Sequence, residues 1–327
     1  MSGGARLVVT GGVGFIGYHL TRALLERGDE VVVIDDLSDA PYPAAEKRRN
    51  LADLEGLDGL SSQLRFLHAD ITDRAAISRA FEGATGVFHL AGLAGVRPSF
   101  ADPAKYMRVN AEGTATVLEV AREQGIERVV FASSSSVYGN DTRLPASEEA
   151  SASAPESPYA ASKRAAELVA SALVRRSPTL RWVGLRYFTV YGPRQRPEMA
   201  ITLFMRSMLA GRVLRVFGDG SMRRDFTHVD DIVRGTLAAF EGAPCGMRVF
   251  NLGSGAPMTL RTLVALLGEV TGVVPQVVYE PQPLGDVDAT FADITRARSE
   301  LGWEPRVLFG DGLQTVLAWV SRGATVA

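Results

Sequence analysis

Cysteine is almost absent from this chain of 327 residues, and histidine is scarce. The single cysteine, Cys245, cannot form an internal disulfide and has no second thiol with which to hold a metal ion. The four histidines, His19, His68, His89 and His228, are scattered and form no metal-binding motif. We therefore expect neither a disulfide scaffold nor a metal centre.

An excess of charge is also missing. The 35 Lys and Arg residues nearly balance the 37 Asp and Glu residues, and the arginines are spread along the chain rather than gathered in a patch. We therefore expect no nucleic acid and no acidic membrane surface as partner. No apolar run approaches the length of a membrane span, and a strand expected from Leu7 leaves no room for a signal peptide. These features favour a globular protein of the cytoplasm.

What the sequence does contain is a glycine-rich turn between an expected strand, Leu7–Thr10, and a stretch of helical character. Residues 11–17 read GGVGFIG, which in this context predicts a dinucleotide site. Gly11 permits the tight turn, Gly14 lets the backbone approach a pyrophosphate, and Gly17 lets the helix pack closely on the sheet. The helix N-terminus would face the anion. An ordinary glycine-rich turn is the alternative.

A second expected strand, Val31–Ile34, ends in Asp35, 18 residues beyond Gly17. A carboxylate at this place can accept hydrogen bonds from the adenosine ribose hydroxyls, and it would repel a 2′-phosphate. No Arg or Lys follows before Lys47. The pattern predicts NAD rather than NADP, unless Asp35 is only a turn residue that closes the strand.

Tyr159 and Lys163 stand four residues apart at the start of an apolar helix, so they share one face. A neighbouring ammonium favours the phenolate, and we expect Lys163 to lower the pKa of Tyr159 and make it a general base. A run of serines, Ser133–Ser136, ends a buried strand upstream. It either carries a catalytic hydroxyl or caps its own backbone.

Strands alternate with amphipathic helices up to about residue 190, which predicts an α/β fold with a Rossmann-type doubly wound parallel sheet. Ligands of such sheets bind at the carboxyl ends of the strands. The remaining expected strands are Leu64–Leu67, Val87–Leu90, Val129–Ala132 and Trp182–Tyr187. The expected helices include Met107–Gln124, Tyr159–Arg175, Ala200–Ala210 and Leu260–Thr271.

We divide the chain into a Rossmann domain, residues 1–188, and a smaller C-terminal α/β region that binds substrate, residues 189–327, with an interwoven boundary. Glycine and proline become denser after the boundary, which indicates irregular segments between the later helices. The segment Ala40–Gly59 is expected to be a long, partly charged connection.

Together these motifs resemble the extended short-chain dehydrogenase/reductases, specifically the NAD-dependent nucleotide-sugar epimerases and dehydratases. The family pattern T-G-G-x-G-F-I-G stands at Thr10–Gly17, its D-[IL] pair at Asp70-Ile71, and its H-L-A-[AG] strand end at His89–Gly92. The resemblance covers the chain from Leu7 to about Pro305 and implies bound NAD. The resemblance also implies that the catalytic residues are Ser134, Tyr159 and Lys163. The cofactor contacts that it implies are Gly11, Gly14, Phe15, Ile16, Gly17, Asp35, Asp70, Ile71, Leu90, Ala91, Gly92, Asn110, Tyr159, Lys163 and Tyr187.

Within the family the chain most resembles the UDP-glucuronate 4-epimerase group. The most specific sign is the stretch 194–200, RQRPEMA, and the run SSSSVYG at 133–139 is typical of the group. The resemblance implies a homodimeric isomerase that converts UDP-glucuronate to UDP-galacturonate, with Tyr159 taking the proton of the 4-hydroxyl and NAD accepting hydride from carbon 4. The implied substrate contacts are Arg97, Ser134, Ser135, Thr189, Arg196, Phe217, Arg224 and Asp286.

Arg196 is our candidate anchor for the uronate carboxylate, because a guanidinium binds a carboxylate through two parallel hydrogen bonds. A solvated loop arginine is the alternative. Arg224 is expected to bind the diphosphate, or else to form a salt bridge with Asp225 or Asp230. Thr189 is expected beside the sugar, or else to satisfy backbone at its strand end.

The chain departs from the family's dehydratases at Ser136, where those enzymes carry Glu, and a serine cannot shuttle a proton near neutral pH as a carboxylate can. Three alternatives remain open: a nucleotide-sugar 4,6-dehydratase, a 4-epimerase of a neutral UDP- or dTDP-hexose, and a non-enzymatic dinucleotide sensor. The sequence does not distinguish uridine from thymidine, or fix the direction of the reaction.

Overall fold

A parallel sheet of seven strands forms the centre of the computed structural model, which describes residues 4–177, 179–281 and 287–324. Its strand order is β11-β6-β5-β4-β1-β2-β3, and every neighbouring pair is parallel. The six strands expected from the sequence are confirmed, and β11 is a seventh that the sequence analysis missed. The bounds are β1 Arg6–Thr10, β2 Glu30–Asp35, β3 Leu64–His68, β4 Gly86–His89, β5 Arg128–Ser134, β6 Arg181–Tyr187 and β11 Gly246–Leu252.

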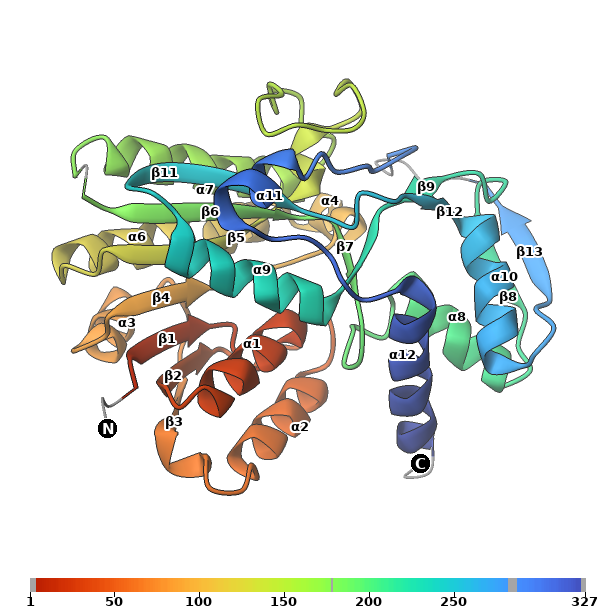
Figure 1. The fold of residues 1–327 in the computed structure, drawn as a ribbon, viewed down its shortest axis with the longest axis horizontal. Coiled ribbons are helices and arrows are strands. Elements are labelled where there is room, and N and C mark those ends of the chain that lie inside the picture. Colours follow the sequence, from red (N-terminus) through yellow and green to blue (C-terminus); the bar gives the residue numbers. More distant parts are fainter. Residues whose placement is uncertain (1–3, 178, 282–286, 325–327) are drawn as a thin grey trace.

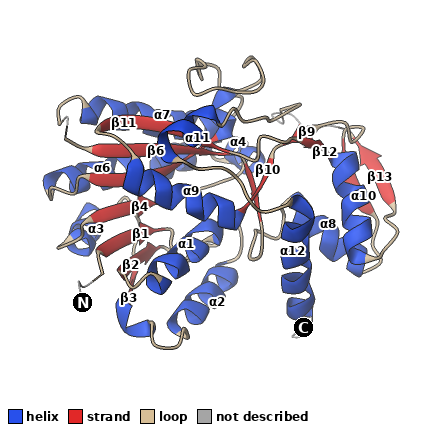
Figure 2. Cartoon of the chain, viewed as in Figure 1, coloured by secondary structure: helices blue, strands red, loops and turns tan. Residues whose placement is uncertain are grey.

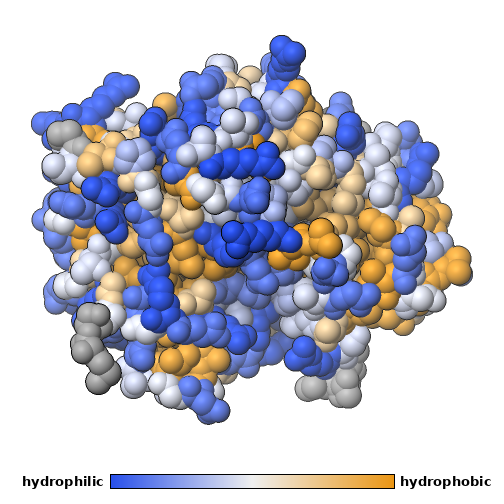
Figure 3. All heavy atoms as spheres, in the orientation of Figure 1, coloured by the Kyte–Doolittle hydropathy of each residue, from blue (hydrophilic) through white to orange (hydrophobic). Residues whose placement is uncertain are grey.

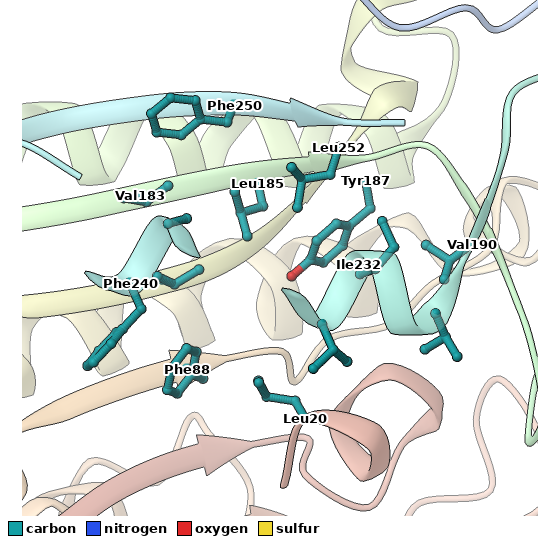
Figure 4. Close-up of a cluster of buried hydrophobic side chains, with 14 of the residues drawn as sticks. Leu20, Phe88, Val183, Leu185, Tyr187, Val190, Ile232, Phe240, Phe250 and Leu252 are labelled. Atoms are coloured by element: carbon teal, nitrogen blue, oxygen red, sulfur yellow. The ribbon is translucent and has the colours of Figure 1, made fainter. Parts of the chain in front are cut away.

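Helices cover both faces of this sheet (Figure 1). Successive strand residues point to opposite faces, so Leu7 and Val9 pack into one core while Val8 packs into the other. One core lies under α1 (Phe15–Glu26) and α9 (Val229–Gly242), where side chains from β4, β6 and β11 meet the helices (Figure 4). The other core lies under α3 Arg74–Phe81, α6 Gly113–Glu123 and α7 Pro158–Val174.

A smaller lobe with a separate core stands beside the carboxyl ends of the strands (Figure 2). It contains α8 Ala200–Leu209, β8 Leu214–Phe217, β9 Arg223–Arg224, β12 Met258–Thr259, α10 Leu260–Thr271, β13 Val277–Glu280 and α12 Phe309–Ala324. Strands β7 (Thr189–Tyr191) and β10 (Phe226–His228) pair in parallel and connect it to the sheet. The chain then returns through α9 and β11, so the two predicted regions exchange segments.

The surface of this lobe carries several exposed apolar side chains, and Figure 3 shows hydrophobic residues gathered over the side that holds α10 and β13. The remaining elements are short or lie at the edges: α2 Ala44–Glu55, η1 Ser61–Gln63, α4 Val96–Ala101, α5 Pro103–Tyr106, η2 Met107–Glu112, η3 Ser135–Tyr138 and α11 Thr295–Leu301. Among the helices described, none has the length and apolar character needed to cross a bilayer.

One expectation about local structure was wrong, and another was confirmed with a change of helix type. The segment expected to be a connection, 40–59, contains the twelve-residue helix α2, whose buried face includes Lys47 and Asn50 beside Ala44 and Leu54. Polar residues on the buried face hide the apolar periodicity by which a helix is recognised. The helix expected over 107–124 begins as a π-helix, η2, and becomes α-helical only at Gly113.

Candidate active site

A cavity of about 650 Å³ lies where the strand ends face the smaller lobe. Of the expected site residues that the structure describes, all but Asn110 line it. Asp286 lies outside the described residues. The lining residues that we predicted are Gly11, Gly14, Phe15, Ile16, Gly17, Asp35, Asp70, Ile71, Leu90, Ala91, Gly92, Arg97, Ser134, Ser135, Tyr159, Lys163, Tyr187, Thr189, Arg196, Phe217 and Arg224.

The glycine-rich turn forms a cradle that has no room for side chains. Gly11 has φ +70°, and a Cβ there would lie 2.6 Å from the backbone nitrogen of Ala91. A Cβ on Gly17 would overlap the carbonyl oxygen of Gly11, where α1 crosses the turn. Helix α1 begins after Gly14 without a side-chain cap, so its first amide groups face the cavity. These features fit a pyrophosphate at the helix N-terminus.

Asp35, at the end of β2, is almost fully buried and has an unexpected neighbour. Lys47 Nζ lies 3.7 Å from Asp35 Oδ1 and 3.7 Å from Asp36 Oδ1, because α2 brings the lysine back to the strand end. Burial raises the pKa of Asp35, and the charge of Lys47 opposes that rise. The ammonium reduces the repulsion that Asp35 would exert on a 2′-phosphate. The sequence argument, which treated Lys47 as distant, was therefore incomplete.

Tyr159 and Lys163 lie on the first turns of α7, and both line the cavity. The helix starts there because Pro158 occupies its first turn and the Ser157 hydroxyl accepts a hydrogen bond from Ala160 N at 3.1 Å. Lys163 Nζ donates a hydrogen bond to the carbonyl oxygen of Ala132 at 2.9 Å, at the end of β5. A Cβ on Gly92 would lie 3.1 Å from the same ammonium, so the glycine keeps space for it.

The pKa of the Tyr159 phenol is not lowered, contrary to our expectation. Burial raises the pKa of Tyr159 above its ordinary value, and the influences that oppose the rise are a hydrogen bond with Ser134 and the charge of Arg196. Lys163 was expected to supply this effect and does not, because its ammonium is directed at the Ala132 carbonyl. Burial also lowers the pKa of Lys163 to about 8.

Ser134 is the serine of the run that is hydrogen-bonded to Tyr159. It ends β5, and its hydroxyl accepts a hydrogen bond from Ser136 N at 3.2 Å. Ser133 points to the opposite side of the strand, where its hydroxyl donates to Glu167 Oε1 at 2.6 Å. Within the run, Ser134 therefore bonds to Tyr159 of the cavity, whereas Ser133 bonds to the buried Glu167.

Glu167 and Arg186 form a buried ion pair that the sequence analysis did not single out. Arg186 binds the Glu167 carboxylate through two hydrogen bonds of 2.9 and 2.8 Å, and Ser133 joins them. The group ties α7, which carries Tyr159, to β5 and β6. Its sequence signal was the position of Glu167 four residues after Lys163, on the catalytic face of the helix.

Asn110, expected to contact the cofactor, lies behind the cavity wall. Its amide oxygen accepts from Leu93 N at 2.7 Å, and its nitrogen donates to Leu93 O and to Ser162 Oγ, both at 2.9 Å. It is 1% exposed, and these bonds occupy its polar groups inside the protein. The π-helix η2 holds it there, between the loop after β4 and α7, which makes it a support for the wall.

Three residues expected to bind substrate meet at the lobe side of the cavity. The Arg97 guanidinium stacks on the Phe217 ring, 4.4 Å from its centroid, and so connects α4 to β8. Arg224 Nη1 donates to the carbonyl oxygen of Arg223 at 3.0 Å. Asp225, proposed as an alternative partner of Arg224, is instead buried, and its carboxylate accepts hydrogen bonds from Ser254, Gly255 and Ala292.

Arg196 lines the cavity together with Tyr159. Its Nη1 donates to Glu198 Oε1 at 2.8 Å, and its charge lowers the pKa of Tyr159. Glu198 is about half exposed, with 47% of its side chain accessible, so the pair opens to the cavity and to solvent. Arg196 is therefore not an isolated loop residue, because it acts electrostatically on the phenol.

The model of the NAD dependent epimerase/dehydratase family matches residues 7–253. A curated relative, the UDP-glucuronate 4-epimerase of Thermodesulfobacterium geofontis, is 37% identical over 315 residues, which cover 95% of each chain. Among solved structures, UDP-glucuronic acid 4-epimerase from Bacillus cereus, in complex with UDP-glucuronic acid and NAD, superimposes with a TM-score of 0.89. It is 34% identical, and the match covers 97% of this chain and 99% of that one.

A dehydratase matches equally well in backbone. DesIV, the dTDP-glucose 4,6-dehydratase from Streptomyces venezuelae, has a TM-score of 0.89 at 34% identity, covering 98% of both chains. The fold therefore does not separate the two reactions, and the side chains of the cavity must do so.

Proposed function

The chain belongs to the NAD dependent epimerase/dehydratase family, and from this membership we propose that it epimerises UDP-glucuronate at carbon 4 to UDP-galacturonate. The observation that carries the proposal is one cavity that joins a dinucleotide cradle, a Ser134–Tyr159 pair and an arginine beside them. No net oxidation occurs in such a reaction, so the protein is an isomerase with NAD as a bound cofactor.

NAD fits the cofactor side of the cavity. The turn around Gly11 and Gly17 would hold the pyrophosphate, and Asp35 with Lys47 would hold the adenosine ribose. Lys163 would donate to the ribose of the nicotinamide. Bound there, NAD would supply the acceptor and the donor of a hydride for carbon 4 of the sugar.

Tyr159 removes the proton from the sugar 4-hydroxyl and gives it back after the sugar has turned. Ser134 donates to the same oxygen while negative charge develops on it, a role worth about 2.7–4 kcal/mol for one donor in measured cases. The hydrogen bond with Ser134 and the charge of Arg196 both lower the pKa of the phenol against the effect of burial. These two neighbours, rather than Lys163, prepare the base before ligands bind.

Arg196 anchors the carboxylate that distinguishes a hexuronate from a hexose. Its guanidinium has donors beyond the one that binds Glu198, and it lies close enough to influence Tyr159. A bound carboxylate is kept in place while the sugar is a 4-keto acid, which otherwise loses carbon dioxide. The base Tyr159 and the anchor Arg196 must act on neighbouring groups of one sugar, the 4-hydroxyl and the carboxylate. In support of this, both residues line the same cavity.

Elimination of water would need a carboxylate of the protein beside the sugar to transfer a proton. Among the described lining residues, no acidic side chain is clearly placed for this role. Ser136 stands where the family's dehydratases carry Glu, and it lines the cavity. The acidic lining residues Asp35, Asp36 and Asp70 belong to the adenosine end, and Glu198 is paired with Arg196. This arrangement favours epimerisation over dehydration.

Incubation of the purified protein with UDP-glucuronate, followed by NMR of the product, tests the proposal. We expect a mixture of UDP-glucuronate and UDP-galacturonate with no change of mass. A product that has lost water or carbon dioxide, or turnover of UDP-glucose but not of UDP-glucuronate, would refute it.

We also propose a cytoplasmic homodimer that pairs through α7 and through the helical stretch formed by η2 and α6. Supporting this, Leu168 on α7 and Met107 at the start of η2 are apolar and exposed, at 55% and 42%. Light scattering should give a molar mass of two chains for the wild-type protein and of one chain for Leu168→Glu. Fractionation of the source cells tests the location.

A further inference from the structure

The loop after β7 (Figure 1) carries three consecutive residues whose side chains have different partners. Arg194 turns back to α1 and α2 on the cofactor side. Gln195 also lines the cavity, and its amide donates to Val190 O at 2.9 Å and accepts from Thr202 on α8 at 3.2 Å. Arg196 enters the cavity. The position of Arg196 therefore depends on how its two neighbours are held.

Arg194 is held by three contacts. Its Nη1 donates to Asn50 Oδ1 and its Nη2 to Asp53 Oδ2, each at 2.6 Å. Its guanidinium also stacks on the Tyr18 ring of α1, 3.9 Å from the centroid. Next to it, the Pro193 carbonyl oxygen is hydrogen-bonded to His19 Nε2 at 2.9 Å. The loop is thus fixed to both helices that cover the glycine-rich turn.

Asn50 extends this connection to the cofactor cradle itself. It is buried on α2, and its Nδ2 donates to the carbonyl oxygen of Val13 at 2.9 Å, inside the glycine-rich turn. A continuous path of side-chain bonds therefore runs from Val13 through Asn50 to Arg194. Two residues further along the chain stands Arg196.

The backbone of Arg194 supports a positioning role. Its φ is +67°, in the left-handed region that non-glycine residues rarely occupy. Such a conformation persists only where surrounding contacts determine it, and here the contacts are those of the guanidinium with Asn50, Asp53 and Tyr18.

We infer that Arg194 is a positioning residue that sets the preference for an acidic sugar, by fixing the Arg196 loop to the cofactor-binding helices. The inference rests on the proposed function, because it requires a substrate carboxylate at Arg196. Arg194 touches neither that carboxylate nor the reacting atoms. Its effect appears in the choice between UDP-glucuronate and UDP-glucose, whose common nucleotide and diphosphate do not depend on Arg196.

Arg194→Asn is the informative variant, because asparagine accepts a left-handed backbone but is too short to reach Asn50 and Asp53. Calorimetric binding of UDP-glucuronate and of UDP-glucose to the NAD-loaded protein gives the ratio of the two dissociation constants. We expect Arg194→Asn to reduce the wild-type preference for UDP-glucuronate by about 10- to 100-fold, as misplacement of a binding group does. Affinity for UDP-glucose should stay near the wild-type value.

Two further variants complete the test. Arg194→Lys keeps a cation that can reach one acceptor but not hold both in a fork, so it should restore part of the preference. Arg49→Asn is the matched control, since Arg49 is an exposed arginine of α2 that pairs with Glu46 at the surface. It should leave both affinities unchanged.

The outcomes are distinguishable. A wild-type preference that Arg194→Asn retains in full would overturn this inference and leave the proposed function standing. Equal weakening of both ligands would also overturn it, because it would show a general structural role. A wild-type protein that does not prefer UDP-glucuronate would refute the carboxylate assignment, and this inference with it.

Discussion

The two sides of the cavity are built from different materials. On the cofactor side the central contacts come from the backbone of the glycine-rich turn, where Gly11 and Gly17 leave no space for a side chain, and side chains such as Asp35 and Lys163 complete the lining. On the sugar side they come from long side chains, Arg97, Arg196 and Arg224, carried by segments far apart in the sequence. We therefore expect single substitutions to change the ligand preference of the second side more readily than that of the first.

Tyr159 stands where the two sides meet, and its removal should have the largest effect on turnover. Tyr159→Phe deletes the group that exchanges the proton, so we expect kcat to fall by about 10²–10⁴-fold. NAD content of the purified variant should be unchanged, because the cradle does not involve the phenol. Tyr106→Phe is the control: its ring packs edge-on against Tyr159, and its hydroxyl only donates to Ala94 O. An active Tyr159→Phe would refute the assignment of the base.

Gly17→Ala should break the cofactor side. The added Cβ would overlap the Gly11 carbonyl oxygen, so α1 or the turn must move. Overpacking of this kind costs about 1–3 kcal/mol of stability, and we expect the variant to lose NAD as well. Thermal unfolding and the NAD content measure both effects. Gly310→Ala, at a place where a Cβ meets no atom within 4 Å, should change neither; full NAD content in Gly17→Ala would contradict the cradle.

This contrast also explains what could be predicted from the sequence. The cofactor side is encoded by short contiguous motifs, and the predicted strands and nearly all predicted lining residues were found there. Lys47 was missed as the neighbour of Asp35 because α2 hides its buried face under polar residues. Arg194 begins the stretch 194–200 that is typical of the group, but its contacts could not be predicted, since its partners Asn50 and Asp53 lie more than 140 residues away in the chain. We predicted that Lys163 lowers the pKa of Tyr159, and this was wrong. Burial raises that pKa, and the Lys163 ammonium is directed at the Ala132 carbonyl rather than at the phenol.

On the sugar side, Arg196→Ala should shift the pH dependence of turnover. A cation favours the phenolate, so Arg196 lowers the pKa of Tyr159, and its removal must raise that pKa. We expect the rising limb of kcat against pH, measured at saturating UDP-glucuronate, to move to higher pH. Arg49→Ala should leave the profile in place. An unshifted or acid-shifted limb in Arg196→Ala would show that the two residues are not coupled.

The smallest effect is expected at His89, within the cofactor side. This imidazole is fully buried between the hydroxyls of Thr10 and Thr114, and burial lowers its pKa from 6.5 to about 3. The unfolded chain therefore binds a proton that the folded protein does not, and stability falls as the pH drops from 6.5 towards 3. His89→Asn should show a shallower decline in the free energy of unfolding over this window. An equally steep decline would show that His89 does not contribute to acid unfolding.

The fate of the hydrogen on carbon 4 tests the central claim most directly. UDP-glucuronate carrying deuterium at carbon 4 can be incubated with the enzyme in ordinary water and the products examined by NMR. Internal removal and return of this hydrogen predicts that UDP-galacturonate keeps its deuterium at carbon 4. Product with ordinary hydrogen at that carbon, taken from solvent, would contradict the account.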